Sequence, residues 1–548
     1  MELLDCRRLT GPNLLWDRPS VMMDIACAKA EADEMAAGLR AGIVGLHERL
    51  GWAAPEFSVK TRVGGLSLAF DGPIDRLYAG IALAEAAWAR LTGQATEPLA
   101  ASLAAIADRA ANEANPALLA LKARAREQQA PFLWDDDEIS IGFGASAQVW
   151  PSTRLPTPDA VDWRRPVRIP IALVTGTNGK TTSSRMCARI LRAAGHHVGL
   201  SSTEGIWIDD LALDEGDYAG PGGARAILRQ DKVDAAVLET ARGGLLRRGL
   251  GVEQADVALI TNIAADHLGD FGSRTLAELL EIKWIISRAV VNDGTLVLNA
   301  DDPLLVEKAS DHPGRIAWFS LDENRSDVEF RPEDGYLIRT GTGIHQRLCR
   351  INDIPLTLNG AARHNIANAL AAAAVCAYLG VDPAAIAAGL TGMQQDDNPG
   401  RANLYHLNGV DIFLDFAHNP HAIAATADLT ARLPARRRLL AFAQAGDRTD
   451  QLLQECSRAA WAHGPDRVII SELAKYARGR AHGEVHGILR AELIRSGCPA
   501  EQIVHVETET EALEHAMGWA RPGDLLILLV LGEADAVRKR LTQLTQGQ

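Results

Sequence analysis

The sequence lacks most features of secreted, membrane-bound or nucleic-acid-binding proteins. Its seven cysteines are an odd number with no Cys-x-x-Cys pair, which indicates reduced thiols rather than a disulfide framework. The longest aliphatic run, Leu525–Leu531, is far too short to span a membrane, and residues 1–8 lack the pattern of a signal peptide. Excess positive charge is also absent: the formal net charge is −14, which disfavours nucleic acid as a partner. We therefore expect a cytoplasmic protein that binds neither membrane nor nucleic acid.

A chain of 548 residues is too long for one ordinary core, so several domains are expected. Residues 1–150 combine a β-type alternation at 57–70 with helical spacing, and they predict a small α+β domain. The helical spacing covers residues 23–50, 81–91 and 99–125. Residues 151–167 contain four prolines and no periodicity, which is typical of a linker.

From residue 168 onward, short apolar strands alternate with helices, which predicts a parallel sheet covered on both faces. The candidate strands are 169–175, 234–239, 257–262, 294–298 and 316–319. They are followed by a β excursion over 325–358 and a long helix over 364–380. We predict that these elements form a central domain spanning residues 168–397.

A second alternating series follows Asn398 and predicts a smaller doubly wound domain over residues 398–548. Its candidate strands lie near 410–416, 438–443, 467–471 and 525–530. Two such lobes joined near Pro399 and Gly400 would enclose a ligand-binding cleft that excludes water when it closes.

The most informative segment is the hexapeptide Gly176-Thr177-Asn178-Gly179-Lys180-Thr181, which follows an apolar strand and leads into a helix. A strand that turns through glycine into a helix directs backbone N–H groups at an anion. Lys180 would reach the terminal phosphates, and the Thr181 hydroxyl would bind Mg²⁺. The spacing is G-x-x-G-K-T rather than the general G-x-x-x-x-G-K-[ST], because position 174 is Val. The segment predicts nucleotide binding.

Glu239 ends the predicted strand 234–239, at the edge where α/β proteins bind ligands. A carboxylate there can share Mg²⁺ with Thr181, since Mg²⁺ typically takes one or two carboxylates plus phosphate oxygens. The alternative is a partner for a helix dipole. Arg242, Arg247 and Arg248 follow, and each either clamps an anionic ligand or lies on a solvated surface.

Two further candidates follow the strand 257–262. The pair Asp266-His267 either binds a metal or caps a helix with a satisfied histidine, and the residues alone leave both interpretations open. Lys283, sixteen residues beyond His267, is a lone cation among apolar neighbours. Taken alone, that pattern favours a lysine whose ammonium extends to water. The H-x-E-x-H order at 482–486 does not match the H-E-x-x-H zinc signature.

Together these motifs resemble the Mur ligase family, which includes peptidoglycan-precursor amino-acid ligases and folylpolyglutamate synthase. The motifs that occur in the family's order are Gly176–Thr182, Glu239–Gly244, Asn262–Leu268, Lys283, Asn299–Asp302, His364–Asn368, Pro399–Arg401 and Asp415–Pro420. A more specific resemblance is to the Mur-like half of the cyanophycin synthetases, through Glu239–Leu250 and Arg478-Gly479-Arg480. Residues 1–150 resemble the N-terminal domain of those synthetases. Their ATP-grasp domain is missing here, because Trp150 is joined to Arg168 by the linker alone.

The resemblance implies roles for individual residues, with ATP and Mg²⁺ as cofactors. The residues implied in nucleotide binding are Gly176, Thr177, Asn178, Gly179, Lys180, Thr181, Thr182, Asn299, Asn365, Asn368, Arg401 and Asp415. The residues implied in Mg²⁺ binding are Thr181, Glu239, His267 and Lys283. Lys283 would act as a carbamate, which replaces the interpretation as a solvent-reaching lysine. The implied catalytic residues are Lys180, Glu239, His267 and Lys283.

The expected fold is α/β: a P-loop Mur-ligase central domain with a parallel sheet, a smaller doubly wound C-terminal domain and an α+β N-terminal domain. The expected activity is an ADP-forming ligase that activates an acceptor carboxylate as an acyl phosphate and joins an amino acid to it. A basic amino acid and an aspartate-type carboxylate are the first candidates among small amino-acid or peptide substrates. A homo-oligomer, dimeric or higher, is also expected. The alternatives are a nucleotide-binding regulator without ligase activity and a Mur-type ligase for another peptide acceptor.

Overall fold

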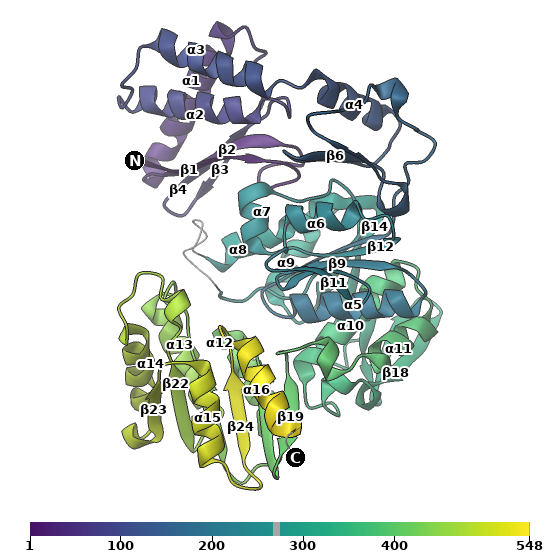
Figure 1. The fold of residues 1–548 in the computed structure, drawn as a ribbon, viewed down its shortest axis with the longest axis vertical. Coiled ribbons are helices and arrows are strands. Elements are labelled where there is room, and N and C mark those ends of the chain that lie inside the picture. Colours follow the sequence, from purple (N-terminus) through teal and green to yellow (C-terminus); the bar gives the residue numbers. More distant parts are fainter. Residues whose placement is uncertain (267–274, 547–548) are drawn as a thin grey trace.

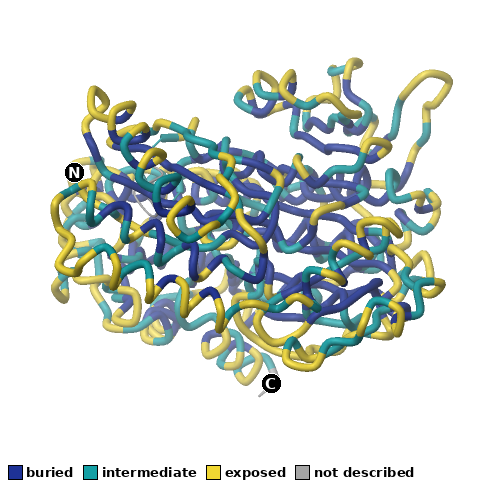
Figure 2. The backbone as a smooth tube through the Cα atoms, turned by 90° about the horizontal axis from the view of Figure 1, so that it is seen from above, coloured by how far each residue is buried: buried dark blue, intermediate teal, exposed yellow. Residues whose placement is uncertain are grey.

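The computed structural model describes residues 1–266 and 275–546, which form four sheets with helices packed on their faces (Figure 1). The central sheet lies between the N-terminal helices and sheet on one side and the C-terminal sheet on the other. Buried residues concentrate in the strands, and most exposed residues lie on the outer helices and loops (Figure 2). Among the described residues, no helix is both long and apolar enough to cross a membrane.

The N-terminal part is a four-stranded antiparallel sheet with helices on one face. Its order is β1-β2-β4-β3, with β1 (Glu2–Leu9), β2 (Ser20–Ala26), β3 (Phe57–Arg62) and β4 (Gly65–Phe70). The helices of this part are α1 (Ala32–Arg49), α2 (Leu77–Leu91) and α3 (Leu99–Glu113). A three-stranded sheet follows, formed by β5 (Phe132–Trp134), β6 (Glu138–Ile141) and β7 (Gln148–Pro151), and α4 (Pro116–Glu127) lies beside β6 (Figure 1).

Two sequence expectations for this part are wrong. Helical spacing was expected from residue 23, yet residues 20–26 form β2, which pairs with β1 and β4 and is almost wholly buried. A strand covered on both faces has no polar alternation, so its period is not visible in the sequence. The helix expected over 99–125 is two helices, because the Asn115 side chain accepts a hydrogen bond from Leu118 N–H at 3.1 Å and Pro116 begins α4.

The central sheet has eleven strands, and those in its middle run parallel. Its order is β11-β10-β9-β12-β8-β13-β14-β15-β16-β17-β18. The parallel strands are β9 (Val198–Ser202), β12 (Ala235–Glu239), β8 (Ile171–Thr175), β13 (Ala255–Ile260), β14 (Val290–Asn299), β15 (Arg315–Phe319) and β16 (Phe330–Glu333). The antiparallel strands at the two edges are β10 (Gly205–Ile208), β11 (Leu211–Glu215), β17 (Tyr336–Gly341) and β18 (Ile344–Arg350).

Helices cover both faces of this sheet, because successive side chains of a buried strand point to opposite sides. In β8, Ala172 and Val174 belong to one core, and Ile171 and Leu173 belong to the other. The helices of the first face are α5 (Lys180–Ala193), α10 (Arg363–Tyr378) and α11 (Pro383–Gly392). Those of the second face are α6 (Pro221–Leu228), α7 (Arg242–Arg248), α8 (Leu276–Trp284) and α9 (Pro303–Lys308).

The C-terminal sheet has six strands in the order β19-β20-β24-β21-β22-β23, and all neighbours are parallel except β19 and β20. The strands are β19 (Asn403–Leu407), β20 (Val410–Asp415), β21 (Arg438–Phe442), β22 (Arg467–Ser471), β23 (Ile503–Val506) and β24 (Leu525–Leu529). The helices are α12 (Pro420–Ala431), α13 (Asp450–Trp461), α14 (Glu484–Arg495), α15 (Glu509–Trp519) and α16 (Ala534–Gln546). The predicted fold class is confirmed, whereas the predicted domain boundaries stay predictions.

Candidate functional site

A cleft of about 2230 Å³ lies between the central and C-terminal sheets. The strand β8 lies between β12 and β13 in the sheet. After β8 the chain forms strands on one side of it, ending with β12, and then crosses to the other side to form β13. This is the switch point at which open α/β sheets bind ligands at the carboxyl ends of their strands. The segments that follow β8, β12 and β13 all line the cleft.

The phosphate loop after β8 has a backbone that only glycine accommodates at two positions. Gly176 has φ +148°, and a Cβ there would lie 1.8 Å from the Thr261 hydroxyl oxygen. Gly179 has φ +83° and precedes α5, and its Cβ would lie 2.3 Å from Asn368 Oδ1. The Lys180 ammonium donates to the Thr177 carbonyl oxygen at 2.9 Å. The loop therefore wraps tightly around the start of α5, as an anion-binding turn does.

Glu239, at the end of β12, is 1% exposed and sits beside this loop. Neither of its carboxylate oxygens meets a donor from the described residues at hydrogen-bonding geometry. Burial raises the pKa of Glu239, while the nearby Lys180 ammonium and Thr181 hydroxyl act in the opposite direction. A buried carboxylate without partners is costly, and a divalent cation would satisfy it. The donor set of Glu239 and Thr181 thus fits the Mg²⁺ that the sequence implies.

Lys283, on α8, is 4% exposed, so its ammonium does not extend to water. Its Nζ donates to the carbonyl oxygen of Gly176, the first residue of the phosphate loop, at 2.6 Å. Burial lowers the pKa of Lys283 well below its ordinary value, and the Lys180 cation lowers it further. His267, the other implied ligand of the second Mg²⁺, lies outside the described residues.

The remaining nucleotide candidates of the central domain form a polar wall of the cleft. Asn368 Nδ2 donates to Asn365 Oδ1 at 3.1 Å, and Asn365 Nδ2 donates to the Leu356 carbonyl oxygen at 2.8 Å. Asn299 Nδ2 donates to the Thr261 carbonyl oxygen at 3.0 Å. The structure therefore brings all three asparagines to the cleft that the phosphate loop lines.

Several phosphate-loop residues also contact their surroundings through side chains. The Thr177 hydroxyl accepts from Ala264 N–H at 3.0 Å. The Asn178 side chain reaches across the cleft, where its Oδ1 accepts from Asn419 Nδ2 of the C-terminal lobe at 2.8 Å. The loop is thus in contact with both lobes.

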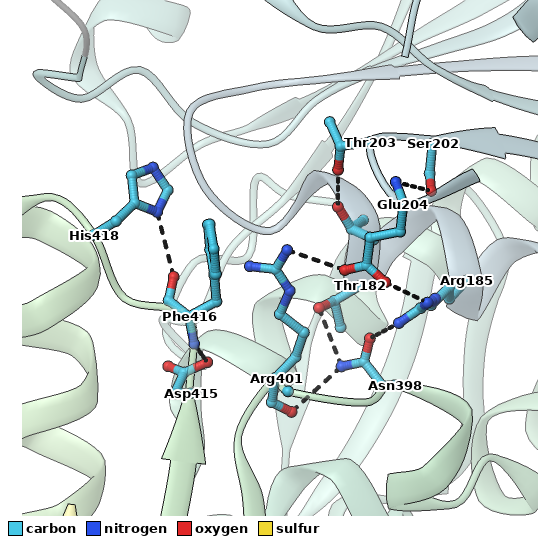
Figure 3. A network of polar contacts seen from close by, with 12 residues as sticks. Thr182, Arg185, Ser202, Thr203, Glu204, Asn398, Arg401, Asp415, Phe416 and His418 are labelled. Atoms are coloured by element: carbon cyan, nitrogen blue, oxygen red, sulfur yellow. Dashed lines mark hydrogen bonds and ion pairs between the residues drawn. The ribbon is translucent and has the colours of Figure 1, made fainter. Parts of the chain in front are cut away.

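The C-terminal lobe contributes Arg401 and Asp415 (Figure 3). Arg401 Nη2 lies 3.1 Å from Glu204 Oε1, and its guanidinium lies 4.1 Å from the centre of the Phe416 ring. Asp415 Oδ1 accepts from Phe416 N–H at 2.8 Å, and its Oδ2 accepts from the Thr426 hydroxyl at 3.0 Å. Both residues line the cleft, and their roles in nucleotide binding stay predictions.

Asp266 joins the two lobes at the other end of the site. Its Oδ1 lies 3.0 Å from Arg448 Nη1, and its Oδ2 lies 3.2 Å from His418 Nε2. The Asp266-His267 pair was expected either to bind metal or to cap a helix, and both interpretations stay predictions because His267 lies outside the described residues. Asp266 itself forms an ion pair between the lobes. Its partners lie more than 150 residues away along the chain, so no local pattern could have revealed them.

Three residues that surround Arg401 were not among the predicted site residues: Glu204, Arg185 and Asn398 (Figure 3). A signal existed: Ser201–Gly205 is a polar segment at the carboxyl end of a parallel strand, β9. That strand was not among those predicted, so the position of Glu204 went unnoticed. His482 and His486 both lie against the His505 ring, and His482 also pairs with Glu507 at 2.9 Å. Among the described residues, these side chains do not form a group that could hold a metal ion.

The fold and the site together define a P-loop α/β protein with a cleft between two lobes. Comparison with known proteins narrows that class, because the Mur ligase middle domain matches residues 174–376 and the Mur ligase, glutamate ligase domain matches residues 400–532. The chain belongs to the Mur ligase family.

Three relatives illustrate the similarity. A cyanophycin synthetase of Geminocystis herdmanii is 35% identical over 73% of this chain and 48% of its own length. A UDP-N-acetylmuramate–L-alanine ligase of Synechococcus elongatus is 30% identical over 67% of this chain and 72% of its own. A bifunctional folylpolyglutamate synthase/dihydrofolate synthase with Mn, AMPPNP and L-glutamate bound shares the fold, with a TM-score of 0.53, 22% identity and coverage of 69% of this chain and 89% of its own. The chain thus spans about half the length of the cyanophycin synthetases it matches.

Proposed function

We propose that the protein is an ATP-dependent, ADP-forming ligase that joins an amino acid to an acceptor carboxylate in the cytoplasm. The observation that carries the proposal is the buried, unpartnered carboxylate of Glu239 next to Thr181 and the phosphate loop. Leaving such a carboxylate without a cation is costly. Mg²⁺ bound to ATP phosphates would supply that cation, because Mg²⁺ is usually held by few carboxylates together with phosphate oxygens.

Each residue then has a role in holding ATP or Mg²⁺. Residues 176–182 and Arg401 would hold the phosphates, and Asn299, Asn365, Asn368 and Asp415 would surround the rest of the nucleotide. Thr181 and Glu239 would hold the first Mg²⁺, and His267 and Lys283 the second. The bound ions supply positive charge that offsets the charge of the phosphates.

Lys283 would serve as a metal ligand only after carbamylation. A neutral amine attacks CO₂, the new N–C bond forms, and the amine proton is released to solvent. The lowered pKa of Lys283 favours the neutral amine that this step requires. The resulting carbamate is an anion next to the Lys180 cation.

The reaction proposed has two steps. An oxygen of the acceptor carboxylate attacks the γ-phosphorus of ATP, and the bond to the ADP oxygen breaks to give an acyl phosphate. The amine nitrogen of the second substrate attacks the acyl carbon and loses a proton, and phosphate leaves. Lys180 and the loop N–H groups offset the charge of the transferring phosphoryl group. Closure of the two lobes over the substrates would exclude water that hydrolyses the acyl phosphate.

We further propose a basic amino acid as the amine and an aspartate-type carboxylate as the acceptor. Support comes from the similarity to cyanophycin synthetase, which covers 73% of this chain.

The direct test is ATP-dependent phosphate release in a screen of amino acids combined with aspartate-containing dipeptides. We expect release with one class of pair, and we expect Lys180→Ala to abolish it while the fold remains intact. The matched control is Lys475→Ala, an exposed lysine in the C-terminal lobe. Nucleotide binding without phosphate release for any pair would instead indicate a nucleotide-binding regulator. Near-normal release by Lys180→Ala would mean that the nucleotide site is misplaced.

A further inference from the structure

Glu204, in the turn between β9 and β10, joins two arginines from distant parts of the chain (Figure 3). Its Oε2 lies 2.6 Å from Arg185 Nη2, on the phosphate-loop helix α5. Its Oε1 lies 3.1 Å from Arg401 Nη2, at the start of the C-terminal lobe. One carboxylate therefore links the phosphate-loop helix to the lobe that faces it.

The carboxylate of Glu204 is charged in this arrangement. Burial acts to raise the pKa of Glu204, but the two guanidinium groups outweigh burial and hold it below its usual value. Glu204 therefore stays ionised at neutral pH, and its ion pairs are not lost to protonation. Burial lowers the pKa of the Arg185 guanidinium, and the negative charge of Glu204 acts in the opposite direction.

Two contacts orient the Arg401 side chain, one through a guanidinium nitrogen and one through the flat face of the guanidinium. Its Nη2 pairs with Glu204, and the guanidinium lies over the Phe416 ring at 4.1 Å. Its Nε and Nη1 form no hydrogen bond to any residue that the structure describes. These donors are thus available in the cleft, while the side chain itself is restrained.

The connection between the lobes rests on the same helix. Asn398 is fully buried, and its Nδ2 donates to the Thr182 hydroxyl at 3.2 Å. Its Oδ1 accepts from Arg185 Nη1 at 3.3 Å. Thr182 and Arg185 are both in the first two turns of α5, next to the phosphate loop. Arg401, three residues beyond Asn398, is therefore held relative to the phosphate-loop helix at two points, by Glu204 and by Asn398.

We propose that Glu204 is a positioning residue that presents Arg401 to the nucleotide phosphates and thereby couples nucleotide binding to the placement of the C-terminal lobe. The inference rests on the proposed function, since it requires a nucleotide at the phosphate loop. Glu204 itself does not contact the reacting atoms. It acts by restraining the free donors of Arg401, so that less conformational entropy is lost when phosphate binds.

The test is a double-mutant cycle read by calorimetric binding of AMPPNP with Mg²⁺. Glu204→Gln keeps the size of the side chain and removes its charge, and we expect the Kd to rise about tenfold. In an Arg401→Gln background, the same change should alter the Kd less than about twofold, because the residue it positions is gone. Glu323→Gln, an exposed substitution outside the cleft, is the matched control and should leave the Kd unchanged.

Steady-state kinetics add a readout that general destabilisation would not produce. Glu204→Gln should raise KM for ATP about tenfold and leave KM for the amine unchanged. Equal effects of Glu204→Gln in both Arg401 backgrounds, or no effect in either, would overturn the inference while leaving the proposed function intact. Failure of the wild-type protein to bind AMPPNP would overturn both together.

Discussion

Glu239 and Lys283 are ionisable side chains buried in one cleft, and burial shifts their pKa values in opposite directions. Each group is disfavoured in its charged form by loss of water. Neither shift has a structural benefit, because an apolar residue of similar size would pack there at lower cost. Buried ionisable groups with shifted pKa values are expected at ligand-binding and catalytic sites, where they interact with the ligand.

Replacing Glu239 should therefore stabilise the ligand-free protein. The carboxyl pKa is higher in the folded chain than its ordinary value of 4.5, so wild-type stability falls as pH rises from 4.5 through the folded pKa. Glu239→Gln removes that loss, and we expect the unfolding midpoint to rise by about 2–4 °C near pH 8. The gain should vanish below pH 4.5, where both states of the wild type are protonated.

Differential scanning fluorimetry without nucleotide measures this effect, and phosphate release should be lost in the same variant. Glu323→Gln provides the matched control at an exposed site. A lower midpoint for Glu239→Gln near pH 8 would show that the carboxylate is already compensated in the ligand-free fold.

Lys283 should carry a carbamate in the active protein. The side chain is buried, and its lowered pKa favours the neutral amine, which reacts with CO₂. Protein incubated with ¹³C-bicarbonate should show a carbamate resonance that Lys283→Met lacks, while Lys308→Met, at a lysine paired with Glu281 and Asp311, should retain it. A high-resolution map with a bare ammonium at Lys283, with Mg²⁺ and nucleotide bound, would contradict this expectation.

Among the elements, α8 matters most to the site because it carries Lys283 near its C-terminal end. Its N-terminus has a capping box: Thr275 accepts from Glu278 N–H at 3.2 Å, and Glu278 accepts from Thr275 N–H at 3.1 Å. Glu278 also accepts from Val63 N–H of the N-terminal sheet at 3.1 Å, and Lys60 lies 2.6 Å from Glu281. The N-terminal sheet thus supports the helix that positions Lys283.

Removing the cap should loosen α8 locally. Thr275→Ala deletes the capping oxygen, which typically costs about 1 kcal/mol. We expect amide hydrogen exchange in residues 276–284 to accelerate about fivefold, since 1.4 kcal/mol corresponds to a factor of ten. Thr542→Ala, at an exposed position of α16 whose hydroxyl donates to the Arg538 carbonyl oxygen, should leave exchange in α8 unchanged. Equal exchange in the two variants would exclude a role for the cap.

Elements with a simple physical signature were predictable from sequence. The strands β8 and β12 read as apolar runs, and the phosphate loop follows from its glycines and lysine. The strand β2 was not predictable, because burial on both faces removes its alternation. The ion pairs of Asp266 and of Arg401 with Glu204 were also hidden, because they join residues that are adjacent only after both lobes have folded.

For the whole molecule, a two-fold dimer is the simplest assembly to propose. Two-fold dimers are the commonest homo-oligomers. Multi-angle light scattering at micromolar concentration should therefore give about twice the chain mass of 58.8 kDa. Added AMPPNP and Mg²⁺ should not change this value. A mass of 58.8 kDa across the micromolar range would show that the protein works as a monomer.

The arrangement of the chain predicts single additions rather than polymer growth. Strand β7 ends at Pro151 and β8 begins at Ile171, so the segment between the N-terminal part and the central sheet is too short to hold a second catalytic domain. Extending an aspartate backbone and decorating its side chains each require a separately activated carboxylate, and the cleft described here would activate one kind.

We therefore expect this chain, incubated with ATP, Mg²⁺, Asp and Arg, to form no long polymer, with or without a short aspartate peptide primer. Single additions to the primer, visible by mass spectrometry as one increment per acceptor carboxylate, are the expected product when primer and amine match the site. Lys180→Ala serves as the control for ATP dependence, because it removes the cation next to the phosphates. Growth of the primer backbone by successive aspartates would mean that the one cleft activates both kinds of carboxylate. The inference that this chain does not extend a backbone would then be wrong.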